Sequence, residues 1–434
     1  MKDLIFTAET QGRREKTGKT NLKNNIMMRR SLSFFIRKYA WRLGVSAVFL
    51  LAAIAVNAQI AVKGETVWTM AGEPITNGVV LLNNGKIEAV GTADQVKIPA
   101  NYKVLTAKVV TPGLIDAHSV IGLNGYMNQP HDQMALDGGG AIQPELRAID
   151  SYNAEEKLIE WVRQFGVTTI HTGHQPSALV SGQTMIAKTV GKDVDEATLV
   201  PTAMIAVTLG SDALAGQGKS PGTRAKEAAM LRAELIKAQE NVKKSDPPKD
   251  LRSQILMSVI KREIPLLITA DKAQDIMTAI RIGKEFNLRV VLDSVSDAQL
   301  VLNEIKASGY PVIVHATMAR AGGDTENLSM EDAAKIKAAG IPVALQSGYE
   351  GYVPKTRVVL FEAAMAAANG LSQRDALALI TIDAAKIIGL DSRIGSIEKG
   401  KDADLAMYDG DPFEYTSHCI GTIINGTVVS DVVR

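Results

Sequence analysis

A short run near residue 110 constrains the fold of this chain more than any other part of it. A strand-like segment, Val109-Val110-Thr111, leads into Pro112-Gly113-Leu114-Ile115-Asp116-Ala117-His118. Strand side chains alternate between the two faces, so His118 shares its face with the residue two positions later. That residue is Val120, whose isopropyl group cannot bind a metal ion. The run therefore predicts a buried strand that ends in a single histidine.

The middle of the chain, residues 111–390, alternates strand-like and helix-like segments, which indicates parallel βα units. The strand candidates are Val109–Ala117, Thr168–His171, Thr184–Lys188, Thr202–Thr208, Pro265–Ala270, Arg289–Asp293, Pro311–His315 and Pro342–Gln346. Amphipathic helices are expected at Ala273–Phe286, Asp297–Ala307 and Met330–Ala339. Residues 222–250 read as a charged helix and a Pro-Pro linker between strands four and five. Eight parallel strands with helices between them predict an α/β fold of the (β/α)8 TIM-barrel type.

Both ends of the chain around this middle part are rich in short strands. Residues 59–110 contain an Asn-Asn-Gly turn at 83–85, and residues 391–434 contain an Asn-Gly turn at 425–426. Such turns join the strands of hairpins. We therefore expect the two ends to form the halves of one small composite β-sandwich domain beside a barrel domain at 111–390.

Residues 1–58 have the parts of a secretory signal peptide. An apolar stretch, Leu43–Val56, is followed by Asn57-Ala58 and preceded by basic residues, namely Arg29, Arg30, Arg37, Lys38 and Arg42. The apolar stretch is shorter than the roughly 20 residues that span a bilayer. This favours cleavage after Ala58 and export to the periplasm or the outside of a bacterial cell, with no stable membrane span. An uncleaved membrane anchor is the alternative, and Met27 or Met28 is an alternative start to Met1.

Charge and cysteine content narrow the classes of partner. Without residues 1–58 the chain keeps 37 basic and 44 acidic residues, a net charge of −7. An acidic domain has no electrostatic footprint for nucleic acid. Cys419 is the only cysteine, so no disulfide can form within the chain. A homo-oligomer is compatible with this composition.

Two separate motifs resemble the amidohydrolase superfamily, and in particular its imidazolonepropionase-like members. One is the run Pro112–His118, which matches the first metal-ligand strand of that family up to its last histidine. The other runs from Leu371 through Thr381-Ile-Asp-Ala-Ala to Gly395-Ser-Ile-Glu-Lys-Gly-Lys-Asp-Ala-Asp-Leu405 and is similar to the terminal signature of the family. The resemblance covers roughly residues 60–430. It implies a barrel in which one or two divalent metals, zinc among them, activate water against amide or cyclic amide bonds.

The resemblance also implies where further metal ligands should stand. The strand-five histidine position carries Thr269, the strand-six histidine position carries Ser294, and the strand-eight aspartate position carries Gly348. Of the usual ligands only His118 remains, so we expect a degenerate metal site.

Other polar residues are predicted at the mouth of the barrel, which is the functional face of this fold. The candidate pocket consists of His118, His171, His174, Asp293, His315 and Glu350. One interpretation is a rearranged metal site built on the four histidines. The other is that His171 and His315 are hydrogen-bonded fillers of the mouth and His174 positions a loop. Residues 122–140 read either as an active-site lid or as a surface excursion.

Two functions are consistent with these observations. The first is an exported hydrolase of non-peptide C–N bonds, acting on a small molecule or a peptide fragment. The second is a metal-free pseudoenzyme that binds a ligand or a partner subunit on the same scaffold. The sequence does not identify a catalytic residue. We predict that His118 and His171 approach each other, and that a complete set of four metal ligands is not formed.

Overall fold

The computed structural model describes residues 59–216, 218–349 and 357–434. The predicted signal peptide and Glu350 lie outside the described residues. None of the helices in these three ranges is long and apolar enough to cross a membrane.

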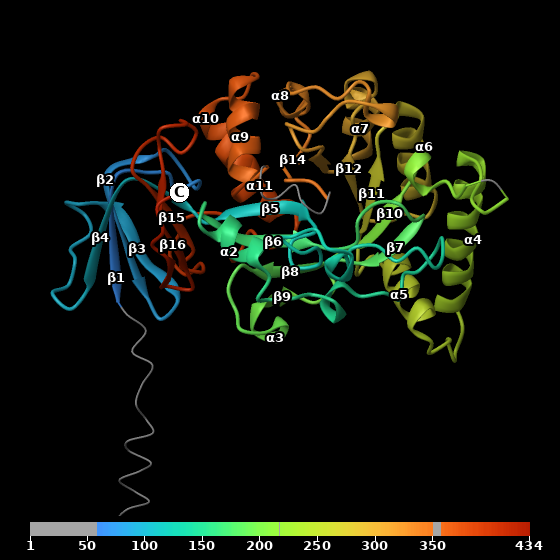
Figure 1. Ribbon diagram of the computed structural model, residues 1–434, viewed down its shortest axis with the longest axis horizontal. Helices are drawn as coiled ribbons and strands as arrows, with labels where there is room; N and C mark the ends of the chain where they lie inside the picture. The colour runs from blue at the N-terminus through green and yellow to red at the C-terminus, as the bar shows by residue number, and fades with distance from the viewer. Residues whose placement is uncertain (1–58, 217, 350–356) are drawn as a thin grey trace, which may run out of the picture. The chain divides into compact units, whose positions relative to one another are not determined.

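Both ends of the described chain contribute to one seven-stranded sheet, with the strand order β17-β16-β15-β4-β1-β2-β3. Its members are β1 (Ile60–Val67), β2 (Ile75–Asn83), β3 (Lys86–Thr92), β4 (Lys103–Pro112), β15 (Leu405–Tyr408), β16 (Cys419–Ile424) and β17 (Thr427–Ser430). The two Asn-Gly turns have the positive φ angles that such hairpins need, with Asn84 at 50° and Asn425 at 50°. Figure 1 shows the strands from the two ends side by side. The halves meet where β4 pairs antiparallel with β15.

The barrel consists of two further sheets. Their strand orders are β14-β13-β12-β11-β10-β7 and β5-β6-β8-β9. The strands are β5 (Leu114–Ser119), β6 (Val167–Thr172), β7 (Val180–Gln183), β8 (Met185–Lys188), β9 (Thr198–Val200), β10 (Ile205–Thr208), β11 (Leu266–Ala270), β12 (Val290–Ser294), β13 (Val312–Val314) and β14 (Val343–Ala344).

Contacts at two places bring these sheets together around a common interior. Only Thr184 separates β7 from β8, so these strands carry the chain from one sheet to the other. On the opposite side, the Ala117 amide donates to the Leu345 carbonyl at 3.3 Å, and Ser119 forms a parallel bridge with Gly348. The predicted fold class, a TIM barrel with a composite β domain, is confirmed.

The prediction of eight parallel strands is wrong at the third strand. β8 pairs antiparallel with β6, and β7 pairs antiparallel with β10. The chain between the paired strands β6 and β8 comprises residues 173–184, which contain β7 but no helix. A parallel crossover usually carries a helix across the sheet, and without one β8 returns antiparallel beside β6. The candidate Val109–Ala117 is also divided, because β4 ends at Pro112 and β5 begins at Leu114.

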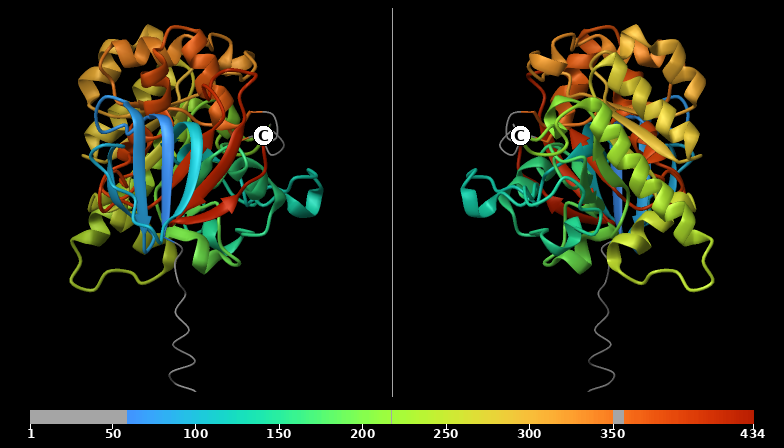
Figure 2. Two further views of the ribbon diagram at one scale, coloured as in Figure 1. Left: turned by 90° about the vertical axis from the view of Figure 1, so that its left-hand side faces the viewer. Right: turned by 90° about the vertical axis from the view of Figure 1, so that its right-hand side faces the viewer.

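Helices flank the barrel strands and are labelled in Figure 1. They are α2 (Lys157–Arg163), α3 (Val194–Ala197), α4 (Arg224–Val242), α5 (Leu251–Ile260), α6 (Ala273–Glu285), α7 (Leu302–Ser308), α8 (Asp332–Ala338), α9 (Val359–Ala368), α10 (Gln373–Leu379) and α11 (Ile382–Ile387). The predicted excursion at 222–250 contains α4, whose first turn is capped by the Thr223 hydroxyl. Figure 2 shows α4 and α5 at the opposite end of the molecule from β1 to β4.

Two layers of side chains fill the strand-lined interior on the side of β11 to β14. The lower, apolar layer consists of Leu267, Val291, Ile313 and Ala344, which belong to one buried cluster. The upper, polar layer lies two residues further along each strand and consists of Thr269, Asp293, His315 and Gln346. Because strand side chains repeat every two residues, the two layers follow each other along the same inner face.

Candidate active site at the mouth of the barrel

The centre of the polar layer is a pair formed by His118 at the end of β5 and Asp293 in β12. His118 Nδ1 lies 3.0 Å from Asp293 Oδ1, and both side chains are buried. The other ring nitrogen, Nε2, is buried without a hydrogen-bond partner in the described ranges. Burial disfavours the imidazolium form, but the Asp293 carboxylate outweighs it and raises the pKa of His118 above its usual value. The pair thus holds one histidine in a fixed orientation with one nitrogen left over.

Asp293 is held by neighbours from two adjoining strands. Thr269 Oγ1 donates to Asp293 Oδ2 at 2.6 Å, and Gln346 Nε2 donates to Asp293 Oδ1 at 2.9 Å. Burial alone would raise the pKa of this carboxyl group, yet His118 and these two donors lower it below its usual value. Asp293 therefore remains a carboxylate inside the barrel.

His171 lies beside the pair but is committed to other bonds. Its ring centroid is 6.0 Å from that of His118, so the two histidines approach each other as predicted. However, Nδ1 lies 2.7 Å from the Ala117 carbonyl oxygen and Nε2 lies 2.7 Å from Thr184 Oγ1. Burial lowers the pKa of His171 to about 4, which keeps the ring neutral. The geometry fits the interpretation of His171 as a hydrogen-bonded filler.

His174 and His315 do not join His118. His174 is packed under Gly182, where an added Cβ would come within 2.5 Å of its Nε2. Its ring nitrogens make no hydrogen bond of normal geometry with the described residues, although the carbonyls of Leu146 and Ala135 lie close to it. His315 instead bonds to α8, with Nε2 lying 3.0 Å from Asp332 Oδ2.

The positions where the family places its other metal ligands lack donors suited to a divalent metal. Thr269 donates to Asp293, and Ser294 Oγ donates to Asp271 Oδ1 at 2.6 Å. Gly348 has no side chain. In the three described ranges, no group of three or more His, Cys, Asp or Glu side chains is arranged to hold a metal ion. A zinc site needs about four ligands, three of them from protein even in an open catalytic site, so the residues present do not fit the family's metal centre.

Asp116 is a structural acid next to this site. The Ser347 amide donates to Asp116 Oδ1 at 3.0 Å, and the Ser347 hydroxyl donates to Oδ2. Burial raises the pKa of Asp116 to about 6 in spite of these bonds. Asp116 thereby ties β5 to the segment after β14 and helps to close the barrel.

An open cavity of about 220 Å³ lies over the ends of β12 to β14. Its floor includes Ser294, His315, Gln346 and Gly348, and its rim carries Asp212, Arg320, Asp324 and Arg357. Acidic and basic groups are mixed around it, which suits a polar ligand.

Sequence reasoning missed an ion network on the rim that faces α4. Arg224 Nε donates to Asp275 Oδ2 at 2.9 Å, and Arg224 Nη2 donates to Asp324 Oδ2 at 2.8 Å. Glu227, one turn later, accepts a hydrogen bond from the Gly210 amide at 3.2 Å. Burial raises the pKa of Glu227 to about 7. No local pattern marks these residues, because they come from α4, α6 and the segment around Asp324, which are far apart in the sequence.

Comparison with known proteins agrees with this architecture. Residues 296–430 match a family described as the amidohydrolase family. An imidazolonepropionase of Fusobacterium nucleatum is 24% identical over 388 residues, which cover 80% of this chain and 88% of that protein.

Solved structures extend the likeness to three dimensions. The crystal structure of an amidohydrolase from Thermotoga maritima is 28% identical, with a TM-score of 0.81 over 86% of this chain and all of that one. A zinc-bound adenosine deaminase from Xanthomonas campestris shares the fold, with a TM-score of 0.51 at 14% identity, over 86% of this chain and 92% of that one. The chain belongs to the amidohydrolase superfamily.

Proposed function

We propose that this protein hydrolyses a non-peptide C–N bond, of the amide or cyclic amide kind, in a small molecule or a peptide fragment. The support comes from the superfamily and from its imidazolonepropionase relatives. The proposed site is the mouth of the barrel, where His315 and Gln346 of the polar layer line the cavity above β12 to β14.

The observation that carries this proposal is the orientation of His118. Its Nδ1 is bound to Asp293, while its Nε2 has no hydrogen-bond partner in the described part of the chain. Buried polar atoms are nearly always paired, so an unpaired nitrogen at the functional face is a site for a substrate or a water molecule. A histidine oriented by a carboxylate is also the usual arrangement of a general base.

The proposed reaction requires one proton to move in each direction. Water loses a proton to His118 Nε2 as its oxygen bonds to the carbon of the C–N group. When the C–N bond breaks, the leaving nitrogen takes that proton back from His118. Asp293 stabilises the imidazolium between the two steps, and Thr269 and Gln346 keep the carboxylate in place. No step is assigned to a metal, because the donor set around His118 does not fit one.

The test is an assay of the protein from Gln59 onward against hydantoin, dihydrouracil and N-acyl amino acids. We expect His118→Gln and Asp293→Asn to lower kcat/KM by about 10²- to 10⁴-fold on any substrate that is turned over. His418→Gln is the matched control, because His418 is half exposed and pairs with Asp409 outside the barrel. Equal activity of His118→Gln and His418→Gln would refute the assignment of the base.

A second candidate is a barrel that binds a ligand without hydrolysing it. The specific observation in its favour is the set of residues at the family's ligand positions, namely Val120, Thr269, Ser294 and Gly348. It predicts saturable binding of a polar ligand that His118→Gln weakens, with no turnover at any pH. The same assay, combined with calorimetric titration of the same compounds, separates the two candidates.

We also propose export, based on the basic and apolar pattern of residues 29–58. Replacing Leu50 and Leu51 with arginine should block translocation. The measurement is fractionation, with the N-terminal residue of the exported protein determined by mass spectrometry. Unchanged export, or a mature N-terminus well upstream of Gln59, would show that the signal interpretation is wrong.

A further inference from the structure

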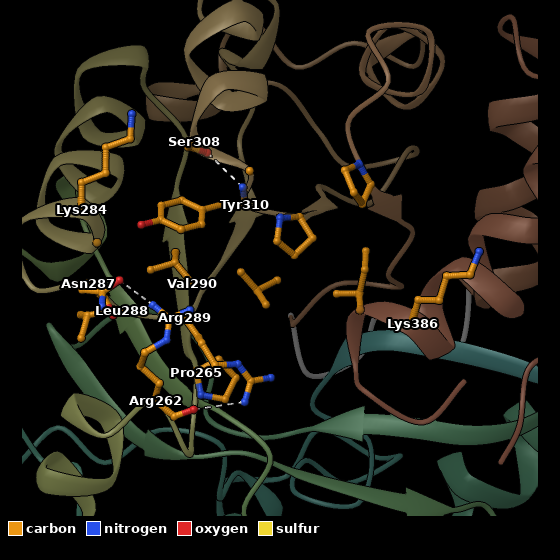
Figure 3. A pocket seen from close by; sticks show the side chains of 16 residues that line it. Arg262, Pro265, Lys284, Asn287, Leu288, Arg289, Val290, Ser308, Tyr310 and Lys386 are labelled. Atoms are coloured by element: carbon orange, nitrogen blue, oxygen red, sulfur yellow. Dashed lines mark hydrogen bonds between the residues drawn. The ribbon is translucent and has the colours of Figure 1, made fainter. Parts of the chain in front are cut away.

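A second cavity, of about 760 Å³, opens at the end of the barrel opposite the proposed active site. Its wall is formed where β11 to β14 begin, together with the last turn of α6 and the end of α11. Figure 3 shows this cavity from close by. Its volume lies within the range of roughly 300–1,000 Å³ that is common for small-molecule sites. The proposed hydrolase does not use this end of the barrel.

Positively charged side chains outnumber carboxylates around this cavity. Its lining contains Arg262, Lys284, Arg289 and Lys386 and no carboxylate. In Figure 3, Lys284 and Lys386 stand on opposite sides, and the two arginines lie between them. Lys386 Nζ does contact Asp383 Oδ1 at 3.1 Å, but that carboxylate also accepts a bond from Lys337. The cavity therefore has a net positive potential.

The two arginines are held by neutral groups. Arg262 Nη1 donates to the carbonyl and to the side-chain oxygen of Asn287, at 2.7 Å and 2.8 Å. Arg289 Nη1 donates to the carbonyl oxygens of Arg262 and Glu263, at 3.4 Å and 3.2 Å. Carbonyls position a guanidinium group but do not neutralise it. Each arginine is thus oriented and keeps further N–H donors for a ligand.

The floor of the cavity is apolar. Three of the four strands begin next to a proline that lines it, namely Pro265, Pro311 and Pro342. Proline has no backbone N–H, so the strand starts offer ring surfaces in place of donors. Val291 and Ile387 complete this surface beside the Tyr310 ring. A small inorganic anion would contact the charged groups but would leave this apolar floor uncovered.

We propose that this cavity binds a small organic anion, one with a flat apolar body and a carboxylate or phosphate group. The apolar body would cover the proline floor, and the acidic group would contact the arginines and lysines. The shape of the cavity does not distinguish a carboxylate from a phosphate, because arginine binds both in the same bidentate manner. The site is separate from the mouth, so this proposal does not depend on the proposed hydrolysis.

The experiment is isothermal titration of the protein from Gln59 onward with 2-naphthoate and with 2-naphthyl phosphate. The neutral 2-naphthamide serves as the control ligand. We expect at least one of the two anions to bind, and to bind more weakly when NaCl is raised from 50 to 500 mM. The stronger of the two identifies the acidic group that the site prefers.

Substitutions in the cavity lining test whether the anion binds there. The double variant Lys284→Gln with Lys386→Gln should weaken binding at least about fivefold, because each exposed charge contributes modestly. Lys226→Gln with Lys399→Gln removes the same charge from exposed positions outside the cavity lining, and it should leave binding unchanged. His118→Gln should also have no effect, which separates this site from the mouth. Equal binding of 2-naphthamide, an unaffected Lys284/Lys386 variant, or no binding of either anion would each overturn the proposal.

Discussion

The apolar and polar layers inside the barrel differ by only two residues on each strand, yet they serve different purposes. Leu267 and Val291 in the lower layer bury hydrocarbon against their neighbours across the barrel. Directly above them, Thr269 donates a hydrogen bond to Asp293, and His118 Nε2 has no hydrogen-bond partner among the described residues. The lower layer stabilises the fold, and the upper layer uses part of that stability to hold charged and polar groups out of water. The comparison explains why a barrel with altered site residues keeps the architecture of its superfamily.

The largest expected effect is loss of stability when the lower layer is truncated. Leu267 is fully buried, so Leu267→Ala should lower the free energy of unfolding by about 2–5 kcal/mol. Leu251, at the exposed start of α5, provides the control Leu251→Ala, which should change stability by less than about 0.5 kcal/mol. Urea denaturation of the two variants checks this. A similar small loss in both would show that the lower layer does not support the barrel.

A smaller effect is expected in the polar layer two residues away. Thr269→Val keeps the shape of the side chain but removes the donor to Asp293 Oδ2. A hydrogen bond to a charged group contributes about 1.5–3 kcal/mol, so a loss within that range is expected. Turnover should fall as well, because Asp293 loses one of the groups that orient it. If Thr269→Val reduced stability but left kcat unchanged, the layer would be purely structural.

The smallest expected effect is a change in the pH dependence of stability, caused by Glu227 near the rim of the mouth. Burial raises the pKa of Glu227 from the usual 4.5 to about 7. Between these two values the unfolded chain has lost its proton and the folded chain still holds it, so stability falls as pH rises through this window. Well above pH 7 both states are ionised and the loss is complete. Glu227→Gln should remove about 1 kcal/mol or more of this decline, because one unit of pKa shift corresponds to about 1.4 kcal/mol.

Unfolding by urea at pH 5 and at pH 8 measures that difference. The wild type should lose more stability between the two pH values than Glu227→Gln does. Glu240→Gln, on the same helix, is the control and should behave like the wild type. Parallel declines in all three proteins would mean that Glu227 titrates normally.

The sequence predicted the barrel well where periodicity and turn residues define it. The strand expected at Pro265–Ala270 is β11 at Leu266–Ala270, and the helix expected at Ala273–Phe286 is α6 at Ala273–Glu285. Periodicity does not encode direction, however, so the antiparallel course of β7 and β8 was missed. The segment between β6 and β8 contains no helix, and this is the local signal that could have indicated their antiparallel course.

The site was predicted less completely, because its contacts join distant segments. His118 and Asp293 were both candidates, but their direct bond links residues 175 positions apart. Nothing in the local sequence shows that Gln346 reaches Asp293 or that Asp332 takes His315 away from the centre. The four cations of the second cavity come from three distant parts of the chain, namely Arg262 after α5, Lys284 and Arg289 on either side of the α6–β12 connection, and Lys386 in α11. No run of basic residues in the sequence therefore indicates this site.

Hydrogen bonds, in place of a metal centre, organise the polar layer around His118. The most direct test is the zinc, iron and manganese content of the protein from Gln59 onward, purified without chelators and compared with His118→Ala. We expect less than about 0.1 metal per chain in both proteins, because Thr269, Ser294 and Gly348 supply no suitable ligands. One equivalent of metal in the wild type that is lost in His118→Ala would contradict it.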